Sequence, residues 1–147
     1  MAGCALCDGP GGELVWQGPR FRVVRTDEGG FPAFYRLIWN GHVREFSQLA
    51  REDRIACMDA LAAMEGALLA HLQPDKVNIA SLGNAVPHLH WHVIARFRWD
   101  SHFPASVWGP QVREASAADM QGVLSCRRQL HAALVAALDC LPKPTPA

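Results

Sequence analysis

Three of the seven histidines in this chain, His88, His90 and His92, stand on alternate residues within the segment PHLHWHVI (87–94). Successive side chains of a β-strand point to opposite faces, so the spacing predicts three imidazoles on one face and apolar side chains on the other. Neighbouring imidazoles on such a strand stand about 6.5–7 Å apart. Because buried polar groups are costly without partners, a row of this kind favours a chemical role over a purely structural one.

Two kinds of chemistry use imidazoles at this spacing. A His-x-His pair is a common set of metal ligands, and His88 with His90 would supply it in a metal-dependent hydrolase. Alternatively, one imidazole attacks as a nucleophile while its neighbours bind an anion. The chain has no carboxylate at a recognisable ligand spacing beside the row, but the residues alone leave both possibilities open.

The elements that must position this row alternate between strands and helices. Apolar residues at helical spacing predict a helix over 51–72, and Ser116-x-x-Asp119 is typical of the start of a second helix that extends to about Leu141. The intervals between strands are mostly short, which favours an α+β fold with an antiparallel sheet of about five strands and helices packed on one face. The predicted strands lie within 13–24, which holds two of them, and at 34–39, 76–82 and 88–97.

Length and composition suit one domain that spans residues 1–147, since 147 residues with a hydrophobic fraction of 50% can bury a sizeable core. We divide this domain into a triad-bearing core, 4–97, and a C-terminal segment with its helix, 98–141. The 14 Lys and Arg residues balance the 14 Asp and Glu residues. The chain therefore lacks the broad positive field that would attract a nucleic-acid polymer or an anionic membrane surface.

The sequence also bears on the cellular compartment. No basic segment followed by an apolar run opens the sequence, so no secretory signal is predicted. The most apolar stretch, 55–72, is interrupted by Asp59, Glu65 and His71, and it is not predicted to span a membrane. We therefore expect a cytoplasmic protein that has neither a membrane nor a nucleic-acid polymer as a partner.

Cys4 and Cys7 form a CxxC near the beginning of the sequence. A single CxxC is compatible with zinc binding, with redox chemistry or with chance. The chain has five cysteines, an odd number for a disulfide framework. The pair therefore needs partners elsewhere in the chain before it indicates a function.

The histidine row resembles a known family signature. The sequence HLHWHVI (88–94) is similar to the His-φ-His-φ-His-φ-φ pattern, with φ hydrophobic, of the histidine triad (HIT) superfamily. Asn78, Asn84 and the CxxC pair occupy positions at which that family often has Asn, Gln and CxxC. The third predicted strand, which ends shortly before His42, resembles the family's hydrophobic strand, turn and histidine. The resemblance covers about residues 4–97 and includes diadenosine tetraphosphate hydrolase-like proteins.

The resemblance implies a HIT-like fold and an enzyme. The implied activity is that of a nucleotide hydrolase or nucleotidyl transferase, acting at the α-phosphate of a dinucleoside polyphosphate or a nucleoside phosphoramidate through a covalent nucleotidyl-histidine. His90 is the implied nucleophile, since a largely neutral imidazole with a pKa near ~6.5 is available to attack. His92 and His88 complete the implied catalytic row. The implied substrate-binding residues are Asn84 and Asn78, beside the phosphate, and Asp27, beside the ribose hydroxyls.

Zinc-containing relatives join the CxxC to a histidine after the early strand and to the first histidine of the triad. The matching residues here are Cys4, Cys7, His42 and His88. Four protein ligands leave no open position for water, so the implied zinc ion is structural. No organic cofactor is expected.

The resemblance also implies a homodimer that binds a nucleotide substrate, because relatives join two sheets across a two-fold axis. Two other functions stay open at this point. One is a metal-dependent hydrolase that uses the histidine row as ligands. The other is a nucleotide-binding regulatory protein in which catalysis is vestigial.

Overall fold

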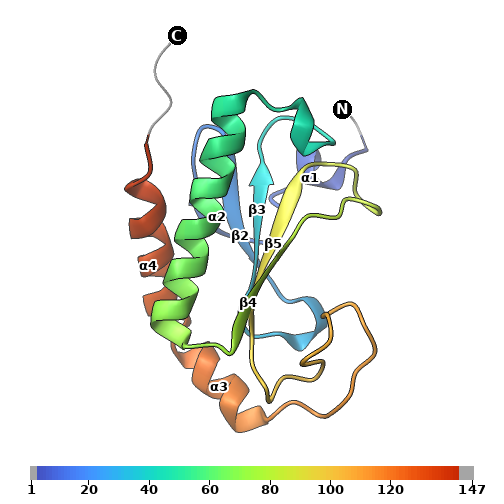
Figure 1. The fold of residues 1–147 in the computed structure, drawn as a ribbon, viewed down its shortest axis with the longest axis vertical. Helices are drawn as coiled ribbons and strands as arrows, with labels where there is room; N and C mark the ends of the chain where they lie inside the picture. The colour runs from blue at the N-terminus through green and yellow to red at the C-terminus, as the bar shows by residue number, and fades with distance from the viewer. Residues whose placement is uncertain (1–2, 143–147) are drawn as a thin grey trace.

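The sheet is the centre of the computed structural model, which describes residues 3–142 (Figure 1). Its strands are all antiparallel to their neighbours and stand in the order β1-β2-β3-β5-β4. This confirms the predicted α+β fold with a five-stranded antiparallel sheet. The strands are β1 (Glu13–Gln17), β2 (Phe21–Thr26), β3 (Phe34–Trp39), β4 (Lys76–Ala80) and β5 (His90–Arg96).

β3 is a central strand because its sequence, FYRLIW, is almost entirely apolar or aromatic, the composition that suits a pleated surface buried on both sides. Tyr35 and Leu37 face the main core of the protein. Arg36 lies between them in sequence and therefore faces the other side of the sheet. There its Cα partner on β5 is His92. The pairing of β3 with β5 thus sets a permanently charged residue beside the histidine row.

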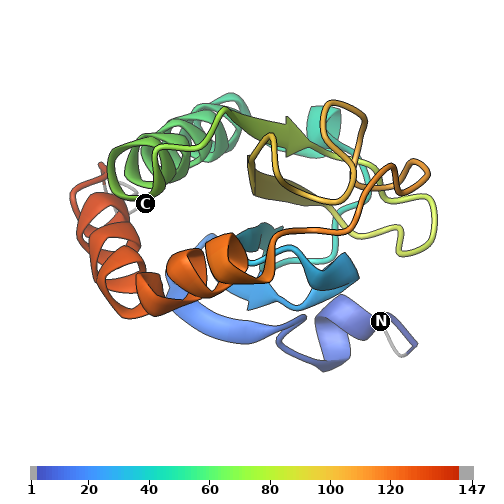
Figure 2. The same cartoon turned by 90° about the horizontal axis from the view of Figure 1, so that it is seen from below.

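Two helices cover the face of the sheet opposite the histidines. α2 (Arg51–Leu72) and α4 (Arg127–Asp139) pack there, and Figure 2 shows both on the same side of the strands. Acidic residues in the first turn of α2 complement the positive end of the helix dipole, and Gln73 ends the helix in a left-handed conformation with φ 47°. The main core between the sheet and these helices includes Leu37, Met64, Leu68, Trp91 and Leu134.

The second predicted helix is divided in the structure. The prediction of one continuous helix to Leu141 is wrong, because α3 (Ala117–Ser125) ends at Cys126 and α4 begins after it. The predicted N-terminal cap of α3 is confirmed, with the Ser116 side chain accepting a hydrogen bond from the Asp119 backbone N–H. The break follows from local side-chain bonding. The Ser125 hydroxyl donates to the Gly122 carbonyl at 2.7 Å, which competes with the helical backbone pattern.

α2 is long and apolar enough to cross a membrane by length and composition alone, with 22 residues and a mean hydropathy of 1.5 in its most apolar window. In the fold, however, one face of α2 packs against the sheet. Ala60, Met64 and Leu68 lie four residues apart on one stripe and are buried in the main core. Its remaining apolar side chains include Ile55, Met58 and Leu69, each at least two-fifths exposed.

The histidine face is covered by irregular chain segments and one short helix. The short helix α1 (Ala5–Asp8) forms a small apolar cluster with β2 and β3. The segment 98–113 contributes to a second apolar cluster with β3 and β5. His92 and Arg36 occupy the row of the sheet between these two clusters. The prediction that helices pack on one face therefore holds for α2 and α4.

Candidate functional site

His90 and His92 pack against each other on β5, with ring centroids 5.0 Å apart. Both side chains are nearly buried, with 7% and 5% of their surface exposed. Their alternation along the strand gives them one face, as predicted. The row of the sheet through His92 runs across four strands, from Val24 through Arg36 and His92 to Ala80.

The tautomer of His90 is fixed by its own strand. Its Nδ1 lies 2.6 Å from the backbone carbonyl oxygen of His88, and since a carbonyl only accepts, Nδ1 must carry the proton. The Nε2 lone pair is then free to attack. Burial lowers the pKa of His90, which keeps the ring unprotonated. The sequence alone does not identify the carbonyl two residues upstream as the group that sets this tautomer.

His92 is a neutral imidazole with unused hydrogen-bonding capacity. Burial, with smaller contributions from His90 and the positive charge of Arg36, lowers its pKa to about 4. Its Nδ1 is buried and has no hydrogen-bond partner among the described residues. The ring touches Phe34 edge-on on one side and Trp108 on another, at centroid distances of 5.6 and 4.9 Å. An unpartnered polar atom in such a setting is a place where a ligand can bind.

Trp108 brings the C-terminal segment into the site. Sequence reasoning could not map residues beyond Arg98 onto any known part of the family. The structure folds 98–113 over the histidine face, and Trp108 lies against His92 with 49% of its surface still exposed. A half-exposed indole beside the histidines gives a substrate an aromatic surface.

His88 leaves the row and joins a different cluster. β5 begins at His90, so His88 precedes the strand and is not held in its alternation. Its Nε2 donates to the Trp39 carbonyl at 2.6 Å, and its Nδ1 lies 3.4 and 3.5 Å from the Sγ atoms of Cys4 and Cys7. His42 Nδ1 lies 3.3 Å from Cys7 Sγ. The alternation within the strand therefore includes His90 and His92 but not His88, whose ring points to thiols of the segment that packs over the same face.

The four donors of this cluster fit a zinc ion. The ligand atoms of Cys4, Cys7, His42 and His88 all lie within 4.8 Å of one another. The Nε2–H of His88 is held by a carbonyl, which leaves Nδ1 as the electron-pair donor, the usual arrangement for a metal-binding histidine. Two thiolates and two imidazoles suit tetrahedral zinc with no position left for water. When bound, the ion would link the N-terminal segment to the start of β5.

The three predicted substrate-binding residues have different surroundings. Asn78 lies on the histidine face, but its Oδ1 accepts a hydrogen bond of 2.9 Å from Arg96. Asn84 is exposed in the loop between β4 and β5. The carboxylate of Asp27 pairs with Arg25, which belongs to the face covered by the helices. The structure therefore brings none of the three into contact with His90.

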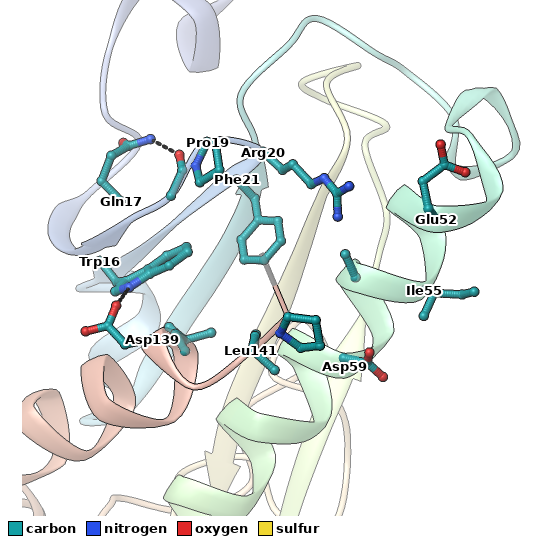
Figure 3. A pocket seen from close by; sticks show the side chains of 14 residues that line it. Trp16, Gln17, Pro19, Arg20, Phe21, Glu52, Ile55, Asp59, Asp139 and Leu141 are labelled. Atoms are coloured by element: carbon teal, nitrogen blue, oxygen red, sulfur yellow. Dashed lines mark hydrogen bonds between the residues drawn. The ribbon is translucent and has the colours of Figure 1, made fainter. Parts of the chain in front are cut away.

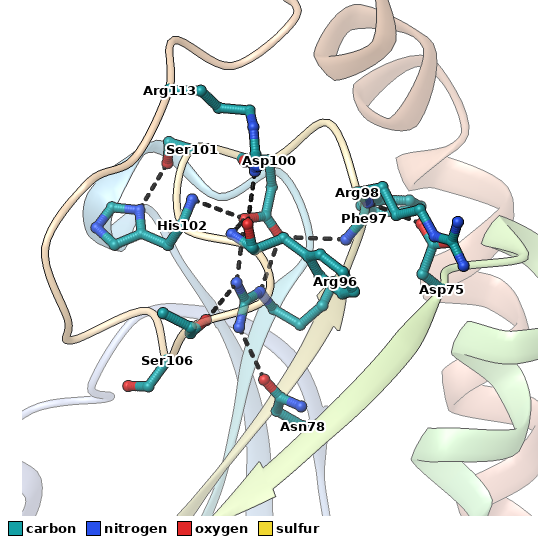
Figure 4. Close-up of polar contacts among 12 residues, drawn as sticks. Asp75, Asn78, Arg96, Phe97, Arg98, Asp100, Ser101, His102, Ser106 and Arg113 are labelled. Atoms are coloured by element: carbon teal, nitrogen blue, oxygen red, sulfur yellow. Dashed lines mark hydrogen bonds and ion pairs between the residues drawn. The ribbon is translucent and has the colours of Figure 1, made fainter.

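A buried ion pair that the sequence did not reveal fixes the loop behind the site (Figure 4). Arg96 and Asp100 have 2% and 3% of their side chains exposed and make two hydrogen bonds of 2.8 and 3.0 Å. Asp100 also accepts three backbone N–H groups of the loop that follows. Burial acts to raise the pKa of Asp100, but these donors outweigh it and lower the pKa. The pair thereby holds the loop that carries Trp108.

A cavity of about 1180 Å³ lies away from the histidines, between the β1–β2 turn, α2 and the end of α4 (Figure 3). Carboxylates of Glu52, Asp59 and Asp139 line it, while its lining cation, Arg20, is paired with Asp53 at 2.9 Å. This charge arrangement repels phosphate groups. The cavity is therefore a poor candidate for a nucleotide site despite its size.

Comparison with known proteins identifies the family. The family model described as the HIT domain matches residues 12–99, more than half of the chain. The chain belongs to the HIT domain family. Members of this family generally bind nucleotides and act as hydrolases or transferases. No match was found among proteins with curated descriptions.

Solved structures agree with this assignment. A histidine triad protein from Bradyrhizobium japonicum is 28% identical, with 80% of this chain and 90% of that chain covered and a TM-score of 0.63. A histidine triad protein from Marinobacter aquaeolei has the same fold at 24% identity, 90% and 93% coverage and a TM-score of 0.68. A zinc-bound histidine triad family protein from Mycobacterium smegmatis shares the fold at 20% identity, 93% and 96% coverage and a TM-score of 0.61.

Proposed function

We propose that this HIT domain protein is a nucleotide hydrolase or nucleotidyl transferase that acts at the α-phosphate of a dinucleoside polyphosphate or a nucleoside phosphoramidate. The observation that carries the proposal is the environment of His90. Its Nδ1–H is held by the His88 carbonyl, so its Nε2 is an oriented nucleophile beside a second neutral imidazole. A metal-dependent hydrolase fits less well, since the described donors of the Cys/His cluster would fill all four positions of a zinc ion.

The proposed reaction has two steps. His90 Nε2 attacks the α-phosphorus and forms an N–P bond, while the bond from phosphorus to the leaving group breaks and that group takes the electron pair. Water then attacks the same phosphorus and gives up a proton to solvent. The N–P bond breaks, its electron pair returns to Nε2, and a nucleoside monophosphate is released. An acceptor other than water in the second step makes the protein a transferase.

Neighbouring groups stabilise the charges that form. The His88 carbonyl supports the positive charge that His90 acquires when its nitrogen is phosphorylated. His92 can donate an N–H to an oxygen of the phosphate or of the leaving group, since a neutral imidazole carries one donor. We expect His92→Ala to lower turnover by about 10²- to 10³-fold, the usual loss when one charge-stabilising donor is removed.

The test is to trap the intermediate. The protein is mixed with diadenosine tetraphosphate in the presence of a chelator for free divalent metal, and intact-protein mass spectrometry follows an acid-labile nucleotidyl adduct. We expect the adduct in the unmodified protein, none in His90→Ala, and normal formation in His71→Ala, an exposed histidine on α2. Turnover by His90→Ala would contradict the proposal. Nucleotide binding without any adduct would indicate the regulatory alternative, and loss of turnover on chelation would indicate the metal-dependent one.

We propose that the Cys/His cluster holds one structural zinc per chain. Zinc binding requires reduced thiols, and thiols stay reduced in the cytosol. The zinc proposal is therefore consistent with our proposal that the protein is cytoplasmic. Elemental analysis of protein purified without chelator tests it directly, with about one zinc per chain expected if all four ligands bind.

We also propose a homodimer. β4 is an edge strand, and Ile79 on its helix-covered face is 41% exposed. On the same side of the sheet, α2 exposes Leu69 and Met58. Unpaired strand edges and exposed apolar surface favour association, and two-fold dimers are the commonest oligomers. Sedimentation of the untagged protein at micromolar concentration tests this, and a species of one chain's 16.1 kDa would contradict it.

A further inference from the structure

Three arginines lie on the histidine face of the sheet, and they differ in how they are bound. Arg22 donates to the backbone carbonyls of the N-terminal segment, at 2.7 Å to Leu6 and 2.9 Å to Pro10. Arg96 is buried in its pair with Asp100. Both guanidinium groups are therefore used to fix the chain. Arg36, the third, is not fixed in this way.

The guanidinium of Arg36 has hydrogen-bonding capacity to spare. Its Nη1 makes a long contact of 3.4 Å to the Gly11 carbonyl, and its Nε is buried with no partner among the described residues. Its side chain keeps 17% of its surface exposed. An arginine can donate five N–H groups, so most of its donors remain available. Since Arg36 is the Cα partner of His92, its charge lies within the candidate active site.

The partner of Arg36 is one that a ligand can replace. Its Nη2 pairs with the carboxylate of Glu28, which is 45% exposed. Glu28 belongs to the short turn between β2 and β3, where Gly29 and Gly30 both have positive φ. A half-exposed ion pair contributes little to stability. An incoming phosphate offers the same negative charge with more acceptor oxygens, so it can take the place of Glu28.

We propose that Arg36 binds the phosphate next to the α-phosphate and thereby makes this site selective for an anionic polyphosphate leaving group over an amine. This inference rests on the proposed function and narrows it to one of its two substrate classes. The α-phosphate must lie at His90 Nε2 for attack, and Arg36 stands one strand away, in the row of His92. That position suits a second phosphate of the same substrate.

The chemistry of the leaving group also favours a polyphosphate substrate over a phosphoramidate. When the bond between the α-phosphorus and a bridging oxygen breaks, a polyphosphate leaves as an anion, and it needs a positive charge nearby rather than a proton. An amine leaving a phosphoramidate must take up a proton as the P–N bond breaks. A guanidinium, whose positive charge is permanent, stabilises the departure of the polyphosphate anion. It cannot supply the proton that the departing amine requires, because arginine is not deprotonated in proteins.

The test compares two substrates with the same nucleoside. The ratio of kcat/KM for diadenosine tetraphosphate to kcat/KM for an adenosine 5′-phosphoramidate is measured for the unmodified protein and for Arg36→Leu. We expect the unmodified protein to prefer the tetraphosphate, and Arg36→Leu to lower the ratio by roughly 10²-fold, as when one charge-stabilising donor is removed. Arg98→Leu is the matched control, since its side chain is 83% exposed and paired with Asp75. Its ratio should equal that of the unmodified protein.

A second variant tests the inference without turnover and without disturbing the sheet. Glu28→Gln removes the competing carboxylate, so calorimetry should show inorganic tripolyphosphate binding about 2- to 5-fold more tightly, the change expected from one exposed ion pair. Arg36→Leu should bind tripolyphosphate at least about 10-fold more weakly. Unchanged affinity in Glu28→Gln would contradict the displacement of Glu28 by phosphate.

The outcomes separate the two proposals. If neither substrate forms an adduct with the unmodified protein, the proposed function is wrong, and the inference about Arg36 is wrong as well. If both substrates react and Arg36→Leu reduces both rates by the same factor, the function stands and the inference about Arg36 is wrong. A preference of the unmodified protein for the phosphoramidate would also overturn the inference.

Discussion

The strand β5, which carries His90 and His92, is anchored differently at its two ends. Just before β5, His88 lies among two thiols and a second imidazole, a cluster that fits a metal ion from outside the chain. At the end of β5, Arg96 pairs with Asp100 and with the loop that follows, using only groups of the chain itself. The first anchor joins residues 84 positions apart, and the second joins residues four positions apart. With the proposed zinc ion, the first end would depend on the metal supply, whereas the other is complete once the strand and its loop have folded.

This difference decides how each end responds to change. Closing a long loop between distant residues costs conformational entropy, which a bound ion has to offset. A local ion pair has no such cost, but it hides two charges from water, so removal of one partner leaves the other uncompensated. The histidines between the two anchors depend on both.

The largest effect on stability is expected at the end of β5 that Arg96 and Asp100 hold. Asp100→Ala should lower the free energy of unfolding by about 3–5 kcal/mol, because it leaves the buried Arg96 without its counter-charge. Denaturant unfolding with zinc in excess measures this change. Asp75→Ala is the matched control, since its partner Arg98 is exposed, and it should cost less than about 1 kcal/mol. Equal losses in the two variants would show that the buried pair is not an anchor.

The second largest effect on stability is expected at the Cys/His cluster before β5, where we propose a zinc ion. Cys4→Ser or His42→Ala should remove zinc and lower the free energy of unfolding by about 2.7 kcal/mol when free zinc is 100-fold above its Kd. A chelator should lower the stability of the unmodified protein similarly and leave that of the variants unchanged. Cys140→Ser, at an exposed free cysteine, is the control. Activity per folded molecule should fall less than stability does. A chelator effect of the same size in Cys4→Ser would contradict the assignment.

The smallest effect is expected between the anchors, at His92. Burial lowers the folded-state pKa of this group to about 4, so between about pH 6.5 and pH 4 the unfolded chain binds the proton and the folded chain does not. Stability is therefore fully present above about pH 6.5 and falls as the pH drops toward 4. The change should be about 1 kcal/mol between pH 6.5 and 5.5, on the scale of 1.4 kcal/mol per pKa unit. His92→Phe should flatten this slope relative to His71→Phe, measured by denaturant unfolding across the pH range. Parallel slopes in the two variants would contradict the assignment.

The comparison also shows what the sequence could predict. The cluster around His88 was predictable because the CxxC, His42 and His88 match the positions of the ligands in zinc-containing members of the family that the chain resembles. The pair of Arg96 and Asp100 was not, because a charged residue at the end of a strand usually remains in water. Arg96 and Asp100 are buried only because residues 98–113 fold over the sheet. Burial by a loop is a tertiary property that no local pattern reports.

The same reasoning applies to single residues at the site. The alternation of β5 predicted that His90 and His92 share a face, but the sequence does not show that the strand starts at His90 and that His88 precedes it. Arg36 was read as part of a hydrophobic strand, and its position beside His92 required the pairing of β3 with β5. The resemblance implied Asp27 beside the ribose of the nucleotide, whereas in the structure its carboxylate pairs with Arg25, which belongs to the other face of the sheet.

In the proposed reaction, the near burial of the two histidines limits how water reaches a nucleotidyl group on His90. Only 7% of His90 and 5% of His92 are exposed, so few solvent molecules can reach the phosphorus from the protein side. Water and any other acceptor would then compete for the same limited access in the second step of the proposed reaction. On the proposed mechanism, the balance between hydrolysis and transfer would depend on which acceptor reaches the phosphorus, and Trp108, half exposed against His92, is a side chain that such an acceptor would meet.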